Sequence, residues 1–413
     1  MEKVVLAYSG GLDTSVLIAM LREKYNAQVI AVTIDLGQHE DLDAIKKKAL
    51  SIGAAEAHTI SASDEFATEY IIPALHANAL YEGAYPLATA LGRPLIAKKL
   101  VEIARASGAS TIAHGCTGKG NDQVRIEAAL AYLDPSITVL APVREYSLTR
   151  ACELEYAKKH NIPVEVSASS FSIDENLWGR SAECGALENE DQEPPEQAFA
   201  WTQSLLSSPN YSAYCEITFR GGVPVELNGK PMSLVALIQE LNRIGGVHSI
   251  GRIDHIESRL IGIKSREVYE APAAQILIKA HQDLEKLVLT RDVLHFKPII
   301  EQTFADLIYN GLWYSPLRQA LSDFTSTVQQ PVTGLVKMRL FKGTAMVIGR
   351  QAEKGLYIKD LATYESAGEF DTPAAKGFIE IWSLPYKVFS IKNNGHKPST
   401  VPNISVSTVN KGA

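Results

Sequence analysis

Residues 4 to 15 read Val-Val-Leu-Ala-Tyr-Ser-Gly-Gly-Leu-Asp-Thr-Ser, and their pattern indicates the fold class of the first part of the chain. An apolar run of strand length ends at Ser9, and a turn rich in glycine and hydroxyl groups leads into a helical pattern. Gly10 and Gly11 lack a Cβ atom, so their backbone can take positive φ and bring amide groups close to an anion. The helix that follows would point its N-terminal N–H groups at the same anion. The stretch therefore predicts a phosphate-binding turn between a strand and a helix.

Two common phosphate-binding motifs are missing from the sequence. No Gly-x-x-x-x-Gly-Lys-Ser/Thr occurs, and no Gly-x-Gly-x-x-Gly follows the strand, which excludes a Walker-type loop and a dinucleotide fingerprint. Ser-Gly-Gly-Leu-Asp-Thr-Ser at 9–15 resembles instead the pyrophosphate loop of N-type ATP pyrophosphatases, which split ATP between its α and β phosphates. A strand-to-helix turn that uses Gly-Gly for its geometry alone is the simpler alternative.

Length and composition indicate a globular enzyme of two domains. A chain of 413 residues is too long for one ordinary core, and 46% hydrophobic with 21% charged residues is typical of a soluble protein. The formal net charge of -7 disfavours a general nucleic-acid surface, so we expect no nucleic-acid partner. No apolar stretch reaches the ~18 residues that span a bilayer. The N-terminus lacks the pattern of a signal peptide, so we expect no membrane partner and a cytoplasmic protein.

The four cysteines lie far apart in the sequence. No Cys-x-x-Cys pair occurs, so they are expected to be reduced thiols and not a disulfide framework or a zinc site. They are Cys116, Cys152, Cys184 and Cys215.

The first ~165 residues alternate short apolar strands with amphipathic helices, which predicts a doubly wound parallel sheet. Ligands bind such sheets at the carboxyl ends of the strands, near the switch point. Two glycine-rich stretches, 9–15 and 114–122, both follow strands, so the fold should bring them together. Strands are expected at 4–8, 28–34, 56–60, 111–114 and 138–141, and helices at about 14–25, 41–52, 64–80, 93–107, 122–133 and 149–160.

The pattern changes to α+β after about residue 165. Residues 185–210 are polar and rich in proline, which indicates an excursion or a lid. Hairpins are expected at 214–219 with 223–227 and at 334–341 with 344–350, and helices at 233–245, 273–289, 298–311 and 315–328. The expected organisation is a nucleotide-binding domain at 1–165, an α+β domain at 166–384 and a tail at 385–413, either loose or held by another subunit.

A second motif, at residues 114–125, reads His-Gly-Cys-Thr-Gly-Lys-Gly-Asn-Asp-Gln-Val-Arg. Its three glycines allow a close approach to a ligand. Asn121 offers donors and acceptors, Asp122 an anion, and Arg125 a planar fork suited to a carboxylate. These groups are the ones needed to hold an amino acid. A surface turn with a helix cap at Asp122 is the simpler alternative.

The same motif, together with Ala-Tyr-Ser-Gly-Gly-Leu-Asp-Thr-Ser at 7–15, resembles the argininosuccinate synthase family. So do Gly-Arg-Ile-Asp-His-Ile-Glu-Ser-Arg-Leu-Ile-Gly-Ile-Lys-Ser-Arg-Glu-Val-Tyr-Glu-Ala-Pro at 251–272 and shorter matches at 79–82, 93–97 and 172–178. The resemblance implies ligation of L-citrulline to L-aspartate at the expense of ATP, through a citrullyl-adenylate, in arginine biosynthesis. It also implies Mg2+ with the ATP and a homotetramer that exchanges C-terminal elements.

The resemblance also implies a set of site residues, carried over position by position. Arg125 would grip the α-carboxylate of citrulline, and Asp122 would face the ammonium of aspartate. No motif identifies a metal ligand. The ATP set is Ala7, Tyr8, Ser9, Gly10, Gly11, Leu12, Asp13, Thr14, Ser15, Ile34 and Gly115, and the aspartate set is Thr117, Asn121 and Asp122. The citrulline set is Tyr85, Thr89, Ala90, Asn121, Arg125, Ser172, Ser181, Glu257 and Tyr269, and the candidate catalytic residues are Ser9, Asp13, Asp122 and Arg125.

Several of these residues have structural alternatives. Tyr85 and Tyr269 also fit half-buried core aromatics. Ser172 also fits a simple cap, and Glu257 fits an ion-pair partner of a nearby basic residue, either Arg259 or Lys264.

One position departs from the family pattern. Residues 86–94 read Pro-Leu-Ala-Thr-Ala-Leu-Gly-Arg-Pro where the family usually has Gly-Thr-Ser-Leu-Ala-Arg-Pro, so the serine expected to meet citrulline is replaced by Ala90. Either Thr89 or a water substitutes for it, or citrulline binds more weakly. One lost hydrogen bond to a neutral partner costs roughly 0.5 to 1.5 kcal/mol.

Rival functions of the same loop class fit the sequence less well. A tRNA thiolase needs reactive cysteines and a basic RNA-binding face, whereas the cysteines here are isolated and the chain is acidic. A glutamine-using synthetase needs a glutaminase domain with its own nucleophile, and the sequence shows no sign of one. A nucleotide sensor without catalysis would be expected to have lost Asp122, Arg125 and Glu257, which are all present.

Overall fold

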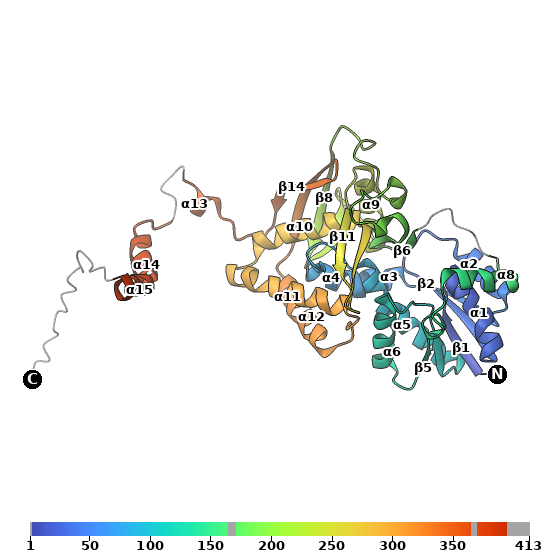
Figure 1. Cartoon of the computed structure of the whole chain (residues 1–413). Coiled ribbons are helices and arrows are strands. Elements are labelled where there is room, and N and C mark those ends of the chain that lie inside the picture. Colours follow the sequence, from blue (N-terminus) through green and yellow to red (C-terminus); the bar gives the residue numbers. More distant parts are fainter. Residues whose placement is uncertain (1, 164–170, 365–369, 395–413) are drawn as a thin grey trace, which may run out of the picture. The chain divides into compact units, whose positions relative to one another are not determined.

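The computed structural model describes residues 2–163, 171–364 and 370–394 (Figure 1). The chain forms two compact units, Met1–Leu356 and Tyr357–Ala413. All the predicted site residues belong to the first unit. Within the described ranges, no helix is both long enough and apolar enough to cross a membrane.

A five-stranded parallel sheet forms the core of the N-terminal part, with the strand order β3-β2-β1-β4-β5. β1 is buried on both faces, because Val4 and Leu6 pack on one side and Val5 packs on the other. The strand order reverses at β1, so the predicted doubly wound fold is confirmed. The strands are β1 (Glu2–Ala7), β2 (Ala27–Asp35), β3 (Glu56–Ser61), β4 (Thr111–Ala113) and β5 (Thr138–Leu140).

Helices cover both faces of this sheet (Figure 1). α1 (Leu12–Lys24), α2 (Leu42–Ile52) and α8 (Arg150–Lys159) lie on one face. α5 (Ala88–Ser107) and α6 (Asp122–Leu133) lie on the other, and the short α7 (Pro142–Glu145) follows β5.

The predicted helix at 64–80 is wrong as one continuous helix. It is divided into α3 (Ser63–Glu65), a π-helical segment Phe66–Ile71 and α4 (Ile72–His76). Pro73 has no N–H and its ring crowds the carbonyl four residues earlier, which favours a wider turn before it. α5 begins five residues before the predicted start at 93, so Pro94 lies inside the helix and not at its first turn.

The second part contains an antiparallel sheet with the order β10-β9-β8-β13-β14, and both predicted hairpins are confirmed in it. All four predicted helices are present, although α11 begins earlier than expected and contains Pro298. The strands are β8 (Ala213–Arg220), β9 (Val223–Leu227), β10 (Lys230–Pro231), β13 (Gly334–Phe341) and β14 (Thr344–Gln351). The helices are α9 (Leu234–Val247), α10 (Pro272–Val288), α11 (Arg291–Tyr309) and α12 (Pro316–Gln329).

A further four-stranded antiparallel sheet was not predicted from the sequence. Its order is β11-β12-β7-β6, with β6 (Ser172–Asn176), β7 (Gly179–Glu183), β11 (Arg252–Ser258) and β12 (Lys264–Glu270). The polar stretch at 185–210 leads away from it and contains two short 3₁₀ turns, Gly185–Glu188 and Glu196–Ala198.

The second unit contains three helices among its described residues: α13 (Lys359–Ala362), α14 (Ala374–Trp382) and α15 (Leu384–Asn394). α14 and α15 expose large apolar side chains, among them Trp382 and Phe389. The predicted tail at 385–413 therefore begins within a helix, and its residues 395–413 lie outside the described part of the chain.

Candidate functional site

The glycine loop at Ser9–Ser15 connects β1 to the first turn of α1. Gly10 has φ +79°, and a Cβ there would come within 3.0 Å of the Ile45 side chain. The Ser9 and Thr14 hydroxyl oxygens lie 3.2 Å apart. Lys48 of α2 donates to the Gly10 carbonyl at 2.7 Å and brings a positive charge to the loop, a contribution that the sequence motif did not reveal. Backbone amides, hydroxyls and a cation together suit a polyphosphate.

The second glycine loop, after β4, lies against the first, as the fold predicts. A Cβ on Gly115 would stand 3.2 Å from Thr14 Cγ2 and 3.6 Å from Asp13 Cβ. The loop then runs past Thr117, which is exposed, to Asn121 at the start of α6. Tyr8 and Ile34 are buried, at the carboxyl ends of β1 and β2.

A polar pocket lies where α5 and α6 meet the four-stranded sheet. Strand pairing places Ser181 opposite Tyr269 and Glu257 opposite Ser265, so the pocket-lining side chains of that sheet share one face. Eight of the predicted residues line the pocket: Tyr85, Thr89, Asn121, Asp122, Arg125, Ser181, Glu257 and Tyr269. Five further residues line it: Gly120, Asp174, Glu183, Arg259 and Glu267.

Three of the predicted aspartate- and citrulline-binding residues lie outside this lining. Thr117 and Ser172 are exposed, although Ser172 pairs with Glu183 and therefore stands on the same face of the sheet. Ala90 is completely buried in α5, whereas its neighbour Thr89 does line the pocket. The geometry therefore favours Thr89 as the hydroxyl that substitutes for the missing serine.

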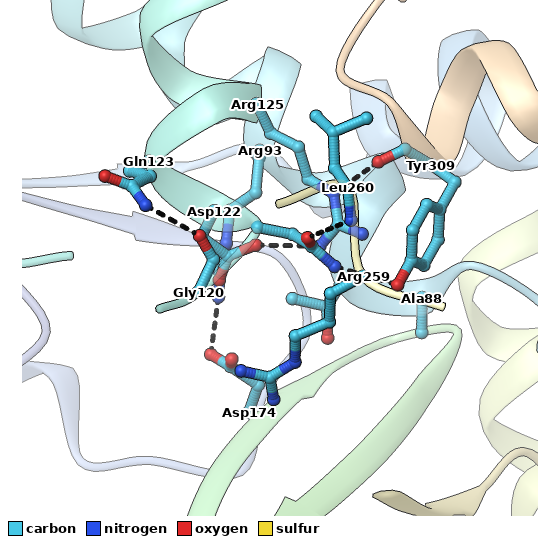
Figure 2. Close-up of polar contacts among 12 residues, drawn as sticks. Ala88, Arg93, Gly120, Asp122, Gln123, Arg125, Asp174, Arg259, Leu260 and Tyr309 are labelled. Atoms are coloured by element: carbon cyan, nitrogen blue, oxygen red, sulfur yellow. Dashed lines mark hydrogen bonds and ion pairs between the residues drawn. The ribbon is translucent and has the colours of Figure 1, made fainter. Parts of the chain in front are cut away.

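Asp122 is held between two arginines (Figure 2). Arg93 Nη2 donates to one carboxylate oxygen at 2.7 Å, and Arg125 Nη1 donates to the other at 2.9 Å. Arg93 also bonds Asp174 at 2.7 Å. Burial acts in the opposite direction, but the two arginines dominate and lower the pKa of Asp122 to about 2. Asp122 is therefore a fixed anion and a weak base, suited to binding an ammonium group.

Contacts from the second part of the chain hold Asn121 and Arg125 in place. Asn121 donates to Tyr309 Oη at 2.8 Å and accepts from the Leu260 backbone N–H at 2.9 Å. Arg125 donates through Nε to the Tyr309 carbonyl at 2.9 Å, and its guanidinium lies over the Tyr309 ring (Figure 2). The side chain of Arg125 is almost completely buried. Both residues are therefore oriented without a ligand.

Two tyrosines hold Glu257. Tyr309 Oη and Tyr269 Oη each lie 2.5 Å from one of its carboxylate oxygens. The Tyr85 ring stacks on the Tyr269 ring at a centroid distance of 4.0 Å, and Tyr85 Oη accepts from the Thr89 N–H at 2.9 Å. The predicted tyrosines and Glu257 thus form one connected group.

Arg259 lines the pocket and contacts two of its carboxyl groups. It donates to Glu183 through a short contact and to Glu267 at 3.1 Å. Its Nη1 also donates to the Lys119 carbonyl at 3.0 Å. This bond connects strand β11 and its turn to the second glycine loop. The suggested pairing of Glu257 with Arg259 or Lys264 is not seen, because Glu257 is taken up by the two tyrosines.

Asp13 lies beside Glu153, a buried residue of α8. Burial and the charge of Asp13 raise the pKa of Glu153 to about 8. In the part of the chain that the structure describes, no three His, Cys, Asp or Glu side chains gather as a metal cage.

The four cysteines form no disulfide. Cys116 belongs to the second glycine loop, and burial is the main cause that raises the pKa of its thiol. A thiol with a raised pKa is a poor nucleophile, which disfavours sulfur-transfer chemistry.

Known proteins match this chain along almost all of its length. The family model "Arginosuccinate synthase N-terminal HUP domain" matches residues 3–163, and "Arginosuccinate synthase C-terminal domain" matches residues 171–389. Proteins named argininosuccinate synthase from Geobacillus sp. (strain WCH70) and Streptococcus thermophilus (strain LMD-9) are 57% and 54% identical. These matches cover 96% and 95% of this chain and 98% of each relative. The chain therefore belongs to the argininosuccinate synthase family of enzymes.

Proposed function

We propose that this chain joins L-citrulline to L-aspartate with ATP, by way of a citrullyl-adenylate, and releases AMP and pyrophosphate. One observation carries the proposal: a phosphate-binding loop and an amino-acid pocket are linked by a single segment. Gly115 of that segment lies against Thr14, and its residues Asn121 and Asp122 line the pocket.

In the first step the ureido oxygen of citrulline attacks the α-phosphorus of ATP. A new bond forms between this oxygen and the α-phosphorus. The bond between the α-phosphorus and the oxygen that bridges to the β-phosphate breaks, and pyrophosphate is released. The loop at 9–15 would bind this leaving group with backbone amides and hydroxyls, and Lys48 would add a positive charge. Ser9 and Asp13 are the candidate catalytic residues here. Mg2+ bound to the phosphates would neutralise charge that develops on the leaving group.

In the second step the α-ammonium of aspartate loses a proton, and the free amine attacks the ureido carbon. The C–O bond to AMP breaks, and the proton that the new C–N bond releases passes to the departing AMP phosphate. Thr117, Asn121 and Asp122 are the proposed aspartate-binding residues. The low pKa of Asp122 supports its role as the anion that pairs with the substrate ammonium, and not as the group that removes a proton.

Citrulline has a charged α-carboxylate and α-ammonium but a neutral ureido group. Arg125 would bind the carboxylate, because Tyr309 and Asp122 fix its position through Nε and one N–H of Nη1, and a guanidinium with five N–H groups still has donors on Nη1 and Nη2. The ureido group needs directional hydrogen bonds from uncharged partners. The proposed partners come from Tyr85, Thr89, Ser172, Ser181, Glu257 and Tyr269.

We further propose a homotetramer in which α14 and α15 dock on another subunit. Their exposed apolar side chains, such as Trp382 and Phe389, support this because large exposed apolar patches mark interaction surfaces. A cytoplasmic location stays a prediction from the sequence.

ATP–pyrophosphate exchange tests the proposal directly. Labelled pyrophosphate should enter ATP only when citrulline is present, because the adenylate forms on citrulline before aspartate reacts. Exchange that proceeds equally without citrulline would refute the assignment. If the exchange also requires aspartate, the citrullyl-adenylate does not form before aspartate binds, and the proposed two-step order is contradicted.

A further inference from the structure

Glu267 of β12 faces the pocket without a role in the set of residues described so far. Its side chain is only 14% exposed. One carboxyl oxygen accepts from Arg259 at 3.1 Å, and the other lies 2.8 Å from Tyr269 Oη. The same phenol oxygen lies 2.5 Å from Glu257. Two carboxyl groups therefore meet at one hydroxyl.

The hydrogen atoms available at the Tyr269 hydroxyl decide the protonation state of Glu267. A tyrosine hydroxyl carries one hydrogen and can donate it to only one acceptor. The shorter contact to Glu257 assigns that hydrogen to Glu257. The contact between Tyr269 Oη and the Glu267 carboxyl needs another hydrogen, because two oxygen atoms with no hydrogen between them would repel each other at 2.8 Å. Glu267 must supply it as a neutral carboxylic acid.

The remaining contacts agree that Glu257 is the anion of this pair. Asn121 donates to Tyr309 Oη at 2.8 Å, which leaves the Tyr309 hydrogen free to point at Glu257. Glu257 thus receives two hydroxyl hydrogens, one on each oxygen. The oxygen of Glu267 that accepts from Arg259 needs no proton, so its other oxygen can carry one.

Burial and the neighbouring carboxyl groups favour the neutral form of Glu267. Burial is the largest cause that raises the pKa of Glu267, Glu257 and Glu183 add to it, and Arg259 only partly offsets them, so the pKa reaches about 8. The pocket lining contains five carboxyl groups and two arginines, and Arg93, which bonds Asp122 and Asp174, adds a third positive charge, so carboxyl groups still outnumber the cations. An arriving substrate ammonium would supply the missing positive charge.

We propose that Glu267 is a further substrate-binding residue, neutral in the empty pocket, which ionises and releases its proton to solvent when the α-ammonium of citrulline enters. The identity of the ligand rests on the proposed function. Citrulline carries its ammonium and its carboxylate on the same carbon. Arg125 and Glu267 line the same pocket, so a carboxylate bound by Arg125 leaves the ammonium in the space that Glu267 also faces.

Calorimetry of citrulline binding in buffers with different ionisation enthalpies measures the protons released. At pH 7 the wild type, saturated with an ATP analogue that cannot be cleaved between the α and β phosphates, should release roughly one proton per site. Its citrulline affinity should rise between pH 6 and pH 8, since binding removes a proton.

E267Q is the decisive variant. A glutamine amide can donate to Tyr269 Oη and accept from Arg259, so it imitates the neutral acid and keeps the empty pocket intact. We expect E267Q to bind citrulline about 10-fold more weakly, with no proton release and no pH dependence. E353Q, on the exposed turn after β14, is the matched control and should behave as the wild type.

The outcomes separate the two proposals. Citrulline binding by the wild type without proton release overturns the role of Glu267 and leaves the ligase function intact. Proton release that persists in E267Q also overturns it, because the proton then comes from another group. Failure of the wild type to bind citrulline, together with exchange that ignores citrulline, refutes the proposed function itself.

Discussion

Arg125 in α6 donates through Nε to the main-chain carbonyl of Tyr309 at the end of α11, with 2.9 Å between the two atoms. The two residues stand 184 positions apart in the sequence. This bond joins the nucleotide-binding sheet to the helices of the second part and fixes the arginine before any substrate arrives. Fixed donors lose less freedom on binding, so the contact should contribute to citrulline affinity.

R125K tests this preorganisation. Lysine keeps the positive charge but loses the hydrogen bond to the Tyr309 carbonyl and cannot form a bidentate pair with a carboxylate. We expect kcat/KM for citrulline to fall roughly 10- to 100-fold, mainly through KM. Steady-state kinetics with citrulline varied gives the answer. R105K, at an exposed arginine of α5, should change little, and an unchanged citrulline KM in R125K would contradict the role of Arg125.

Gly311 offers a second test of the same junction. It has φ +74°, and a Cβ there would lie 2.7 Å from Arg125 Cα. Gly229 has a similar φ of +72° but open space around it, which makes G229A a matched control. Both alanines are strained by the positive φ, but only G311A also pushes on Arg125. We expect G311A to lower the free energy of unfolding by roughly 2 to 4 kcal/mol and G229A by about 1 kcal/mol.

Urea unfolding and citrulline KM measure the two effects. KM should rise only in G311A, because the displaced backbone carries the guanidinium that faces the substrate. Equal losses of stability in the two variants, with unchanged KM, would show that the junction tolerates movement.

The first domain was predictable because its central strands, β1, β2 and β4, are largely buried. Val4 to Leu6 have apolar partners on each side, so β1 appears as a continuous apolar run that ends at the glycine loop. The four-stranded sheet gave no such signal. β12 reads Lys-Ser-Arg-Glu-Val-Tyr-Glu, and its pocket-facing positions hold Ser265, Glu267 and Tyr269. Side chains selected to line a polar pocket remove the alternation of apolar and polar residues by which strands are recognised.

The candidate site was predictable only in part, for a related reason. Resemblance identified Glu257 and Tyr269, but Glu267 becomes meaningful only when its contact with Tyr269 is known. Arg93 was read as the start of a helix, whereas its role depends on Asp122, 29 positions away. Pairings between distant charged residues leave no local pattern in a single sequence.

E153Q tests the carboxyl pair beside the phosphate loop. Burial and Asp13 raise the pKa of Glu153 to about 8, so the folded protein holds a proton that the unfolded chain loses above its ordinary pKa near 4.3. The contribution of Glu153 to the free energy of unfolding should therefore fall as pH rises from about 4.5 to 8. Glutamine cannot ionise, so E153Q should gain roughly 1 to 3 kcal/mol relative to the wild type between pH 5 and pH 8.

Urea unfolding at several pH values gives this difference. E155Q, on the exposed side of the same helix, is the control and should show no such gain. A difference between E153Q and wild type that stays constant with pH would mean that Glu153 is ionised throughout.

Thr89 and Ala90 can be separated by two substitutions. T89V removes the hydroxyl that lines the pocket but keeps the backbone N–H that bonds Tyr85. We expect the citrulline KM of T89V to rise roughly 2- to 10-fold, the effect of one hydrogen bond to a neutral group. A90S should leave KM within about 2-fold, because that side chain is enclosed in the core. The opposite ranking would assign the site to position 90.

The C-terminal helices are expected to hold the tetramer together. Trp382 and Phe389 are 64% and 68% exposed, so W382K with F389K replaces two apolar contacts by charges without disturbing a core. The mass in solution should then fall below that of a tetramer, as it should after removal of residues 385–413. Sedimentation velocity measures this, with K387S and K392S as a control on the same helix pair. A tetramer that survives both changes would exclude these helices from the interface, and a smaller wild-type assembly would refute the tetramer.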